Sequence, residues 1–253
     1  MTSYYSRYLA GDRVEVWKEL VQLGDHIHSH LQADAMDVCR EIASRTAINL
    51  ALLHGRLADI GYRFASPDAA FVEATAQDAS ALAQVEQSLG QVPLILRAWY
   101  ERFHSVNFSQ DESQLHGETA LSANPDPVAG LGCNNVLIVL DLQSCLGLRA
   151  TLIDNESDSE SLVRLQHFLP TGGWASNCDP KGFILPNTGV DGVFYNEGFG
   201  NVTFVDELRM AFDAGGFPFW RHLLQTRRRS YPIRVPPDYA RLRPILCDEL
   251  VPI

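Results

Sequence analysis

The sequence predicts an α+β protein, in which helices pack against a mixed, mostly antiparallel β-sheet. Apolar residues recur at helical spacing through the first hundred residues, most clearly over residues 34–60. Beyond residue 120 the pattern changes to short segments rich in β-branched and aromatic residues, separated by turn clusters such as "PNTGVDG". Because 46% of the 253 residues are hydrophobic, the chain can bury a sizeable core without metal or disulfide cross-links.

An N-terminal helical hairpin is the first expected unit. One helix is expected over residues 12–31 and a longer one over residues 34–60, each with an apolar face. Gly61 follows the second helix and supplies the left-handed residue that ends many helices. We therefore predict an N-terminal helical extension over residues 1–62 and an α+β domain over residues 63–253.

The stretch "LGQVPLILRAWYERF" raises the choice between a cofactor box and a packed core. Gly90 ends the preceding helix, and Pro93 suits the first turn of a new one, where a missing N–H is tolerated. Trp99, Phe103 and Val106 then recur at three- and four-residue steps. Burying a large apolar side chain contributes about 1.5–3 kcal/mol, so core packing explains these residues without a ligand.

Strands and one further helix are expected in the remaining chain. The strands are expected within residues 134–142, 146–154, 161–170, 181–186 and 191–196. The helix is expected to begin after Thr203, whose hydroxyl can cap it with Asp206 three residues on. Gly215 and Gly216 are expected to end it.

The charge of the chain favours basic partners. It has 20 basic and 31 acidic side chains, a formal net charge of −11 at pH 7, whereas a general nucleic-acid binder carries a basic surface. Four acids are concentrated in "DNESDSE", which we expect to connect two strands: Asp154, Glu156, Asp158 and Glu160. A solvated loop and a contact patch for a basic partner both account for such a cluster.

No motif in the sequence specifies catalysis. The serine-nucleophile and phosphate-binding patterns G-x-S-x-G and G-x-x-x-x-G-K-[ST] are absent. His26, His28 and His30 form "HIHSH", but no further ligand pair at zinc spacing accompanies them. A polar connection between helices explains these histidines, and a metal-dependent enzyme is the alternative. We expect no cofactor and no metal.

Cysteine usage and hydropathy indicate a cytoplasmic protein. The five cysteines are an odd number and contain no C-x-x-C pair, which suits reduced thiols better than a disulfide framework. The first residues show no apolar signal segment, and no run approaches the ~18–20 apolar residues that span a bilayer. We therefore expect no contact with a membrane.

The stretch "VEQSLGQVPLILRAWYERFHSVNF" resembles the helix–glycine–proline–helix element of the SUKH superfamily, which includes yeast cell-wall assembly regulators and many bacterial immunity proteins. The positions of that element are held by Leu89-Gly90, Pro93 and Trp99-Tyr100. The stretches "PDPV", "FILPNTGVDG" and "TFVDELRMAFDAGGFP" resemble large bacterial members with an additional N-terminal helical pair. The similarity covers about residues 36–253, and it departs from the family at "HSVNFSQDES", where a glycine is more usual.

The resemblance implies a non-enzymatic protein-binding domain, an immunity-type protein that neutralises a bacterial toxin by masking its active surface. Nuclease toxins have basic clefts, and an acidic inhibitor gains association rate through electrostatic steering. The contact residues that we expect are Asp154, Glu156, Asp158 and Glu160. An orphan regulatory or scaffold protein is the alternative that the sequence leaves open, together with the oligomeric state.

Overall fold

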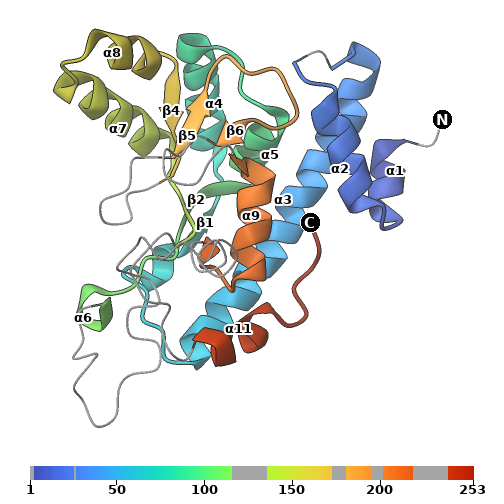
Figure 1. Cartoon of the computed structure of the whole chain (residues 1–253), viewed down its shortest axis with the longest axis vertical. Coiled ribbons are helices and arrows are strands. Elements are labelled where there is room, and N and C mark those ends of the chain that lie inside the picture. The colour runs from blue at the N-terminus through green and yellow to red at the C-terminus, as the bar shows by residue number, and fades with distance from the viewer. Residues whose placement is uncertain (1–2, 26, 116–135, 173–180, 195–201, 219–238) are drawn as a thin grey trace.

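The computed structural model describes residues 3–25, 27–115, 136–172, 181–194, 202–218 and 239–253. It confirms the α+β class: helices make up most of the described chain, and short strands form small antiparallel sheets among them (Figure 1). None of the described helices combines the length and the hydrophobicity that crossing a bilayer requires.

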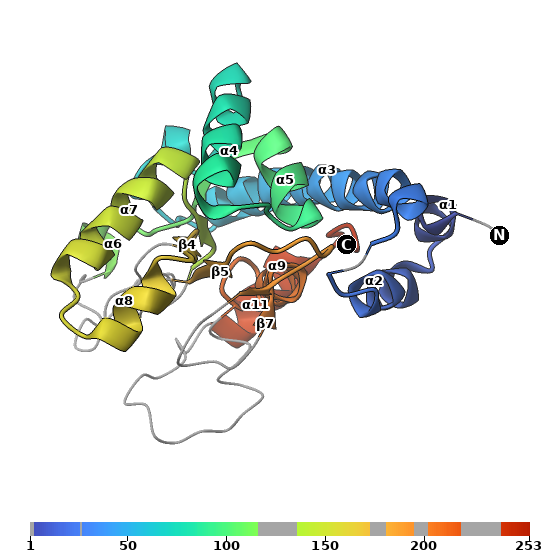
Figure 2. The same cartoon turned by 90° about the horizontal axis from the view of Figure 1, so that it is seen from above.

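The longest helix is the centre of the fold. Helix α3 (Ser29–Asp59) packs against α1 (Tyr4–Leu9) at one end and also against α5 (Leu94–Arg102) (Figures 1 and 2). The prediction of a long helix over residues 34–60 is confirmed, with a start five residues earlier. The helix expected over residues 12–31 is shorter, because α2 comprises only Arg13–Gln22.

Helices α4 (Ala76–Leu89) and α5 are joined as the sequence predicts. Gly90 adopts a φ of +90°, which an L side chain rarely tolerates, and Pro93 is the residue before α5. Trp99 is fully buried, with its ring centroid 4.5 Å from that of Phe103 and 5.1 Å from that of Phe204. The interpretation of this segment as core is therefore confirmed.

The strands are shorter than predicted. The first sheet has the strand order β1 (Phe71–Glu73), β2 (Phe103–Asn107), β3 (Ile138–Val139). The second sheet pairs β4 (Phe168–Pro170) with β5 (Gly182–Ile184), and the third sheet pairs β6 (Val193–Phe194) with β7 (Val202–Thr203). The expected continuation of α5 to Val106 is wrong, because the backbone becomes extended at Phe103 and Val106 pairs with Val139. A 3-10 turn (Pro67–Ala69) precedes β1 and contacts β2, and the short helix α6 (Glu112–Leu115) follows β2 in the sequence.

Two predicted strands are helices. The strands expected within residues 146–154 and 161–170 are replaced by α7 (Leu142–Asn155) and α8 (Ser159–Leu165), and only β4 remains of the second. Each helix begins after an aspartate, since the Asp141 carboxylate accepts from the Ser144 N–H (2.9 Å) and Asp158 from the Ser161 N–H (2.8 Å). The apolar pattern of "LGLRATLID" fits the period of a helix as well as that of a strand. The N-caps supplied by Asp141 and Asp158 favour the helix.

Helix α9 (Phe204–Asp213) has two caps at its start. The Thr203 hydroxyl accepts from the Asp206 N–H (3.3 Å), as the sequence predicts. The Asp191 carboxylate, more than ten residues earlier, accepts from the N–H groups of Phe204 and Val205, each at 3.2 Å. The helix therefore holds the β6 region against its N-terminus.

One cluster of buried hydrophobic residues extends through the described chain. It contains residues of both predicted domains, among them Tyr8, Leu53, Trp99, Phe183 and Leu246. The division at residue 62 stays a prediction, and the core itself is shared across it.

The last residues run along α3, after helix α11 (Tyr239–Cys247). Asn49 is fully buried: its side-chain amide donates to the Val251 carbonyl (2.9 Å), and its side-chain oxygen accepts from the Val251 N–H (2.7 Å). Arg56 lies two turns further along α3 and donates to the Leu246 carbonyl at 3.1 Å. These contacts attach residues 246–253 to the central helix.

Replacing Asn49 with alanine removes both hydrogen bonds to Val251. Two backbone groups then lose their partners, and we expect the free energy of unfolding to fall by about 2–3 kcal/mol. Ile48→Ala, at a half-exposed neighbour, is the matched control and should cost less than about 1 kcal/mol. Urea denaturation measures both, and equal losses would contradict the role of Asn49.

Stability also depends on pH through Asp191. Burial raises the pKa of this carboxyl to about 6, although hydrogen bonds from Gly192, Val205, Thr203 and Phe204 oppose the shift. The folded state therefore binds a proton more tightly than the unfolded state does. The contribution of this proton to the free energy of unfolding is complete below about pH 3.8, the pKa of the carboxyl in the unfolded state. It is lost as the pH rises through 6.

Asp191→Asn tests this dependence, because asparagine keeps its shape and stays neutral. We expect the unfolding free energy of the variant, relative to the unchanged protein, to rise by up to about 3 kcal/mol between pH 4 and pH 7.5. Denaturation curves at several pH values measure this difference. A constant difference across that range would show that burial does not raise the pKa of Asp191.

Candidate functional site

Helices α7 and α8 form a hairpin that projects from the body of the molecule (Figures 1 and 2). The base of α7 packs against α4 and β4, and α8 contacts α7 and β4. Leu142 and Cys145, both in the first turn of α7, are the buried residues of that helix, and α8 has none. The far end of the hairpin is exposed, as far as the described residues show.

The four predicted contact residues lie together at that far end. Asp154 is in the last turn of α7, Glu156 is its C-cap, Asp158 is the N-cap of α8, and Glu160 is in its first turn. We call these four residues the acidic tip. The sequence analysis places this cluster between two strands, which is wrong, because it connects two helices.

The acidic tip is charged and exposed. Asp154, Asp158 and Glu160 are exposed and Glu156 is half-buried; none of the four forms an ion pair with a residue that the structure describes. Hydrogen bonds from the backbone and then the side chain of Ser161 lower the pKa of Asp158. The tip therefore presents negative charge to solvent with no internal cation that the described structure places against it.

Apolar surface accompanies the acids. Val163 on α8 is 60% exposed, and Leu152, Ile153 and Leu162 are half-buried. Protein interfaces combine a more apolar centre with a polar, solvent-accessible rim. The hairpin provides both within one short segment.

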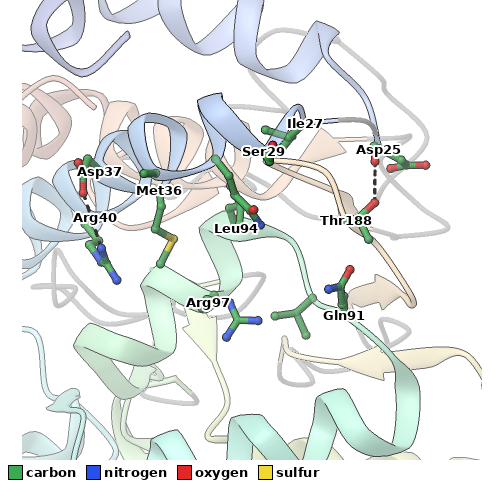
Figure 3. Close-up of a pocket in the computed structure, with 13 residues that line it drawn as sticks. Asp25, Ile27, Ser29, Met36, Asp37, Arg40, Gln91, Leu94, Arg97 and Thr188 are labelled. Carbon is green, nitrogen blue, oxygen red and sulfur yellow. Dashed lines mark hydrogen bonds and ion pairs between the residues drawn. The ribbon is translucent and has the colours of Figure 1, made fainter. Parts of the chain in front are cut away.

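A groove of about 630 Å³ lies elsewhere, between the first half of α3, the α4–α5 connection and the loop before β6 (Figure 3). Figure 3 shows Arg97 and Gln91 on one side of the groove; at its far end the Thr188 hydroxyl donates to the Asp25 carbonyl at 2.8 Å. No pattern in the sequence predicts this groove, because its lining residues come from segments that are far apart in the chain.

The cations of the groove are already paired. Arg40 contacts Glu101 at 2.8 Å and Asp37 at 3.6 Å, and Arg97 forms an ion pair with Glu86. These carboxylates neutralise the two guanidinium groups that line the groove. An anionic ligand would have to displace them, so the groove is a weaker candidate than the acidic tip.

The predicted histidine cluster lies near the start of α3. His28 is the N-cap residue of α3 and His30 is in its first turn, with ring centroids 5.6 Å apart in a stacked arrangement. His26 lies outside the described residues. Within the described ranges, no three His, Cys, Asp or Glu residues are grouped so that they could hold a metal ion.

No protein-family model, curated protein or solved structure matches this chain.

The N-cap of α7 should stabilise the hairpin. Asp141→Ala removes the acceptor for the Ser144 N–H, and we expect a loss of about 1 kcal/mol in stability with faster amide hydrogen exchange in α7. Asp141→Asn retains an acceptor and is the matched control. Unchanged exchange in α7 of the alanine variant would show that other contacts hold the hairpin.

Proposed function

We propose that this chain is a cytoplasmic, non-enzymatic protein-binding domain, and that its acidic tip contacts a basic surface of the partner. The observation that carries the proposal is the position of the four acids. They lie at the exposed end of a projecting helical hairpin, and no ion pair with a described residue neutralises them.

The hairpin suits recognition because its base and its tip are built differently. Leu142 and Cys145 anchor α7 in the core, so the direction of the hairpin is fixed by packing. The acids at the far end contribute little to that packing. Exposed charges of one sign accelerate the association of an oppositely charged protein and act over about 10 Å at 0.1 M salt.

The partner that we propose is a basic bacterial toxin whose active surface the chain masks. This part of the proposal rests on the resemblance to the SUKH superfamily at Gly90, Pro93 and Trp99-Tyr100. The order α4, Gly90, Pro93, α5 supports it, as does the formal net charge of −11. A nuclease with a basic cleft has the surface charge that the acidic tip would attract.

The test captures partners from native lysate at low ionic strength with a tagged chain. The hairpin variant carries Asp154→Asn, Glu156→Gln, Asp158→Asn and Glu160→Gln, which retain polar side chains and an N-cap acceptor. The control variant carries Asp59→Asn, Asp68→Asn, Glu112→Gln and Asp248→Asn, four exposed acids outside the hairpin. Both variants change the formal net charge from −11 to −7.

We expect the unchanged chain and the control variant to capture one stoichiometric basic protein that higher ionic strength releases. The hairpin variant should associate with that protein about 10-fold or more slowly at low salt, with a flatter salt dependence. Equal association of the two variants would remove the acidic tip from the interface. Absence of any stoichiometric partner would contradict the proposed function.

A further inference from the structure

The groove beside α3 and α5 has an apolar floor. Met36 on α3, Val92 in the α4–α5 connection and Leu94 at the start of α5 line it, and the rest of the fold buries most of each side chain. Figure 3 shows Met36 and Leu94 in the middle of the groove. The volume of about 630 Å³ is within the range of pockets that hold small molecules. The floor therefore favours a ligand with an apolar part.

An acidic residue lies at each end of this floor. Figure 3 shows Asp37 near Arg40 at one end and Asp25 near Thr188 at the other. Both aspartates are exposed. Asp37 lies eight residues after Ser29, about 12 Å along the axis of α3, and Asp25 precedes that helix. The two acids therefore mark the ends of a long groove and do not form one compact cluster.

The charges at the groove leave an excess of two negative charges. The charged residues among those that line it are Asp25, Asp37, Arg40 and Arg97. Arg40 contacts Glu101 at 2.8 Å and Arg97 forms an ion pair with Glu86, so each guanidinium already has a carboxylate of its own. Asp37 has only a longer contact to Arg40, at 3.6 Å, and Asp25 forms no ion pair with a described residue. A cation is therefore the ligand that would balance the groove.

The helix ends at the groove do not reverse this balance. Helices α3 and α5 both begin there, and the N-terminal end of a helix is equivalent to about half a positive charge. The two ends together offset only about half of the negative excess. At α5, moreover, the Leu94 and Ile95 N–H groups donate to the carbonyls of Gly189 (3.1 Å) and Val190 (3.0 Å), so an anion would have to displace these bonds.

We propose that the groove binds a linear polyamine, with its alkyl segments on the apolar floor and its ammonium groups at Asp25 and Asp37. Aliphatic amines are cations at neutral pH, and an alkyl chain that covers Met36 and Leu94 removes apolar surface from water. A compact cation such as Mg²⁺ would reach one aspartate and leave the floor uncovered. This site is separate from the acidic tip and goes beyond the proposed protein-binding function.

The first test titrates spermine into the purified full chain by calorimetry, at constant ionic strength. Ala33→Arg places a long cationic side chain in the groove, because Ala33 lines the groove and is exposed. Ala51→Arg, at an exposed alanine of the same helix outside the groove, is the matched control with the same change in charge. We expect one spermine per chain, bound about 10-fold or more weakly by Ala33→Arg and nearly unchanged by Ala51→Arg.

The second test removes the charges at the two ends. Asp25→Asn with Asp37→Asn is compared with Asp59→Asn and Asp68→Asn, since each pair changes the formal net charge from −11 to −9. We expect only the first pair to weaken spermine binding about 10-fold or more, and the variant that neutralises the acidic tip to retain it.

Three results overturn the proposal. The first is that the unchanged chain does not bind spermine. The second is that either groove variant loses no more affinity than its matched control. The third is that neutralising the acidic tip abolishes binding, because spermine then binds the tip and not the groove. Magnesium chloride at the same ionic strength should not displace spermine, and equal competition would likewise contradict a role for the apolar floor.

Discussion

The packing of α5 against α3 is the interaction on which the other parts of the fold depend. The apolar face of α3 is fully buried, and Trp99 on α5 belongs to the same hydrophobic core. The ring of Trp99 contacts the rings of Phe103 at the start of β2 and Phe204 at the start of α9. Helix α4 packs on α5, and α7 packs on α4. The acidic tip is thus held in place through a continuous series of packed helices that begins at α3.

This arrangement separates the residues that stabilise the fold from those that we propose contact a partner. Side chains that hold the fold together, such as Trp99 and Leu142, are buried, whereas the acids of the hairpin tip touch few other residues. Like charges in a short exposed segment repel one another only weakly in water, so the fold tolerates them there.

Sequence reasoning succeeded where local chemistry decides the structure. Gly90, Pro93 and Thr203 each impose a backbone conformation or a cap, and the end of α4 and the starts of α5 and α9 agree with the prediction. It failed for α7 and α8, because a short apolar pattern fits two periods and the capping role of Asp141 and Asp158 was overlooked. The cluster of acids is evident from the stretch "DNESDSE", and its role in binding stays a prediction. The groove beside α3 and α5 could not be found, because its lining residues come from separate segments that meet only in the folded chain.

A hydrogen-exchange footprint of the complex would show whether the α7–α8 hairpin forms the interface with the partner. The purified chain is compared alone and bound to the protein that it captures, and amide protection is measured along the sequence. Recognition through the hairpin predicts slower exchange in residues 152–165 on binding, with little change in the groove beside α3 and α5. Protection confined to that groove, with the hairpin unchanged, would contradict the account.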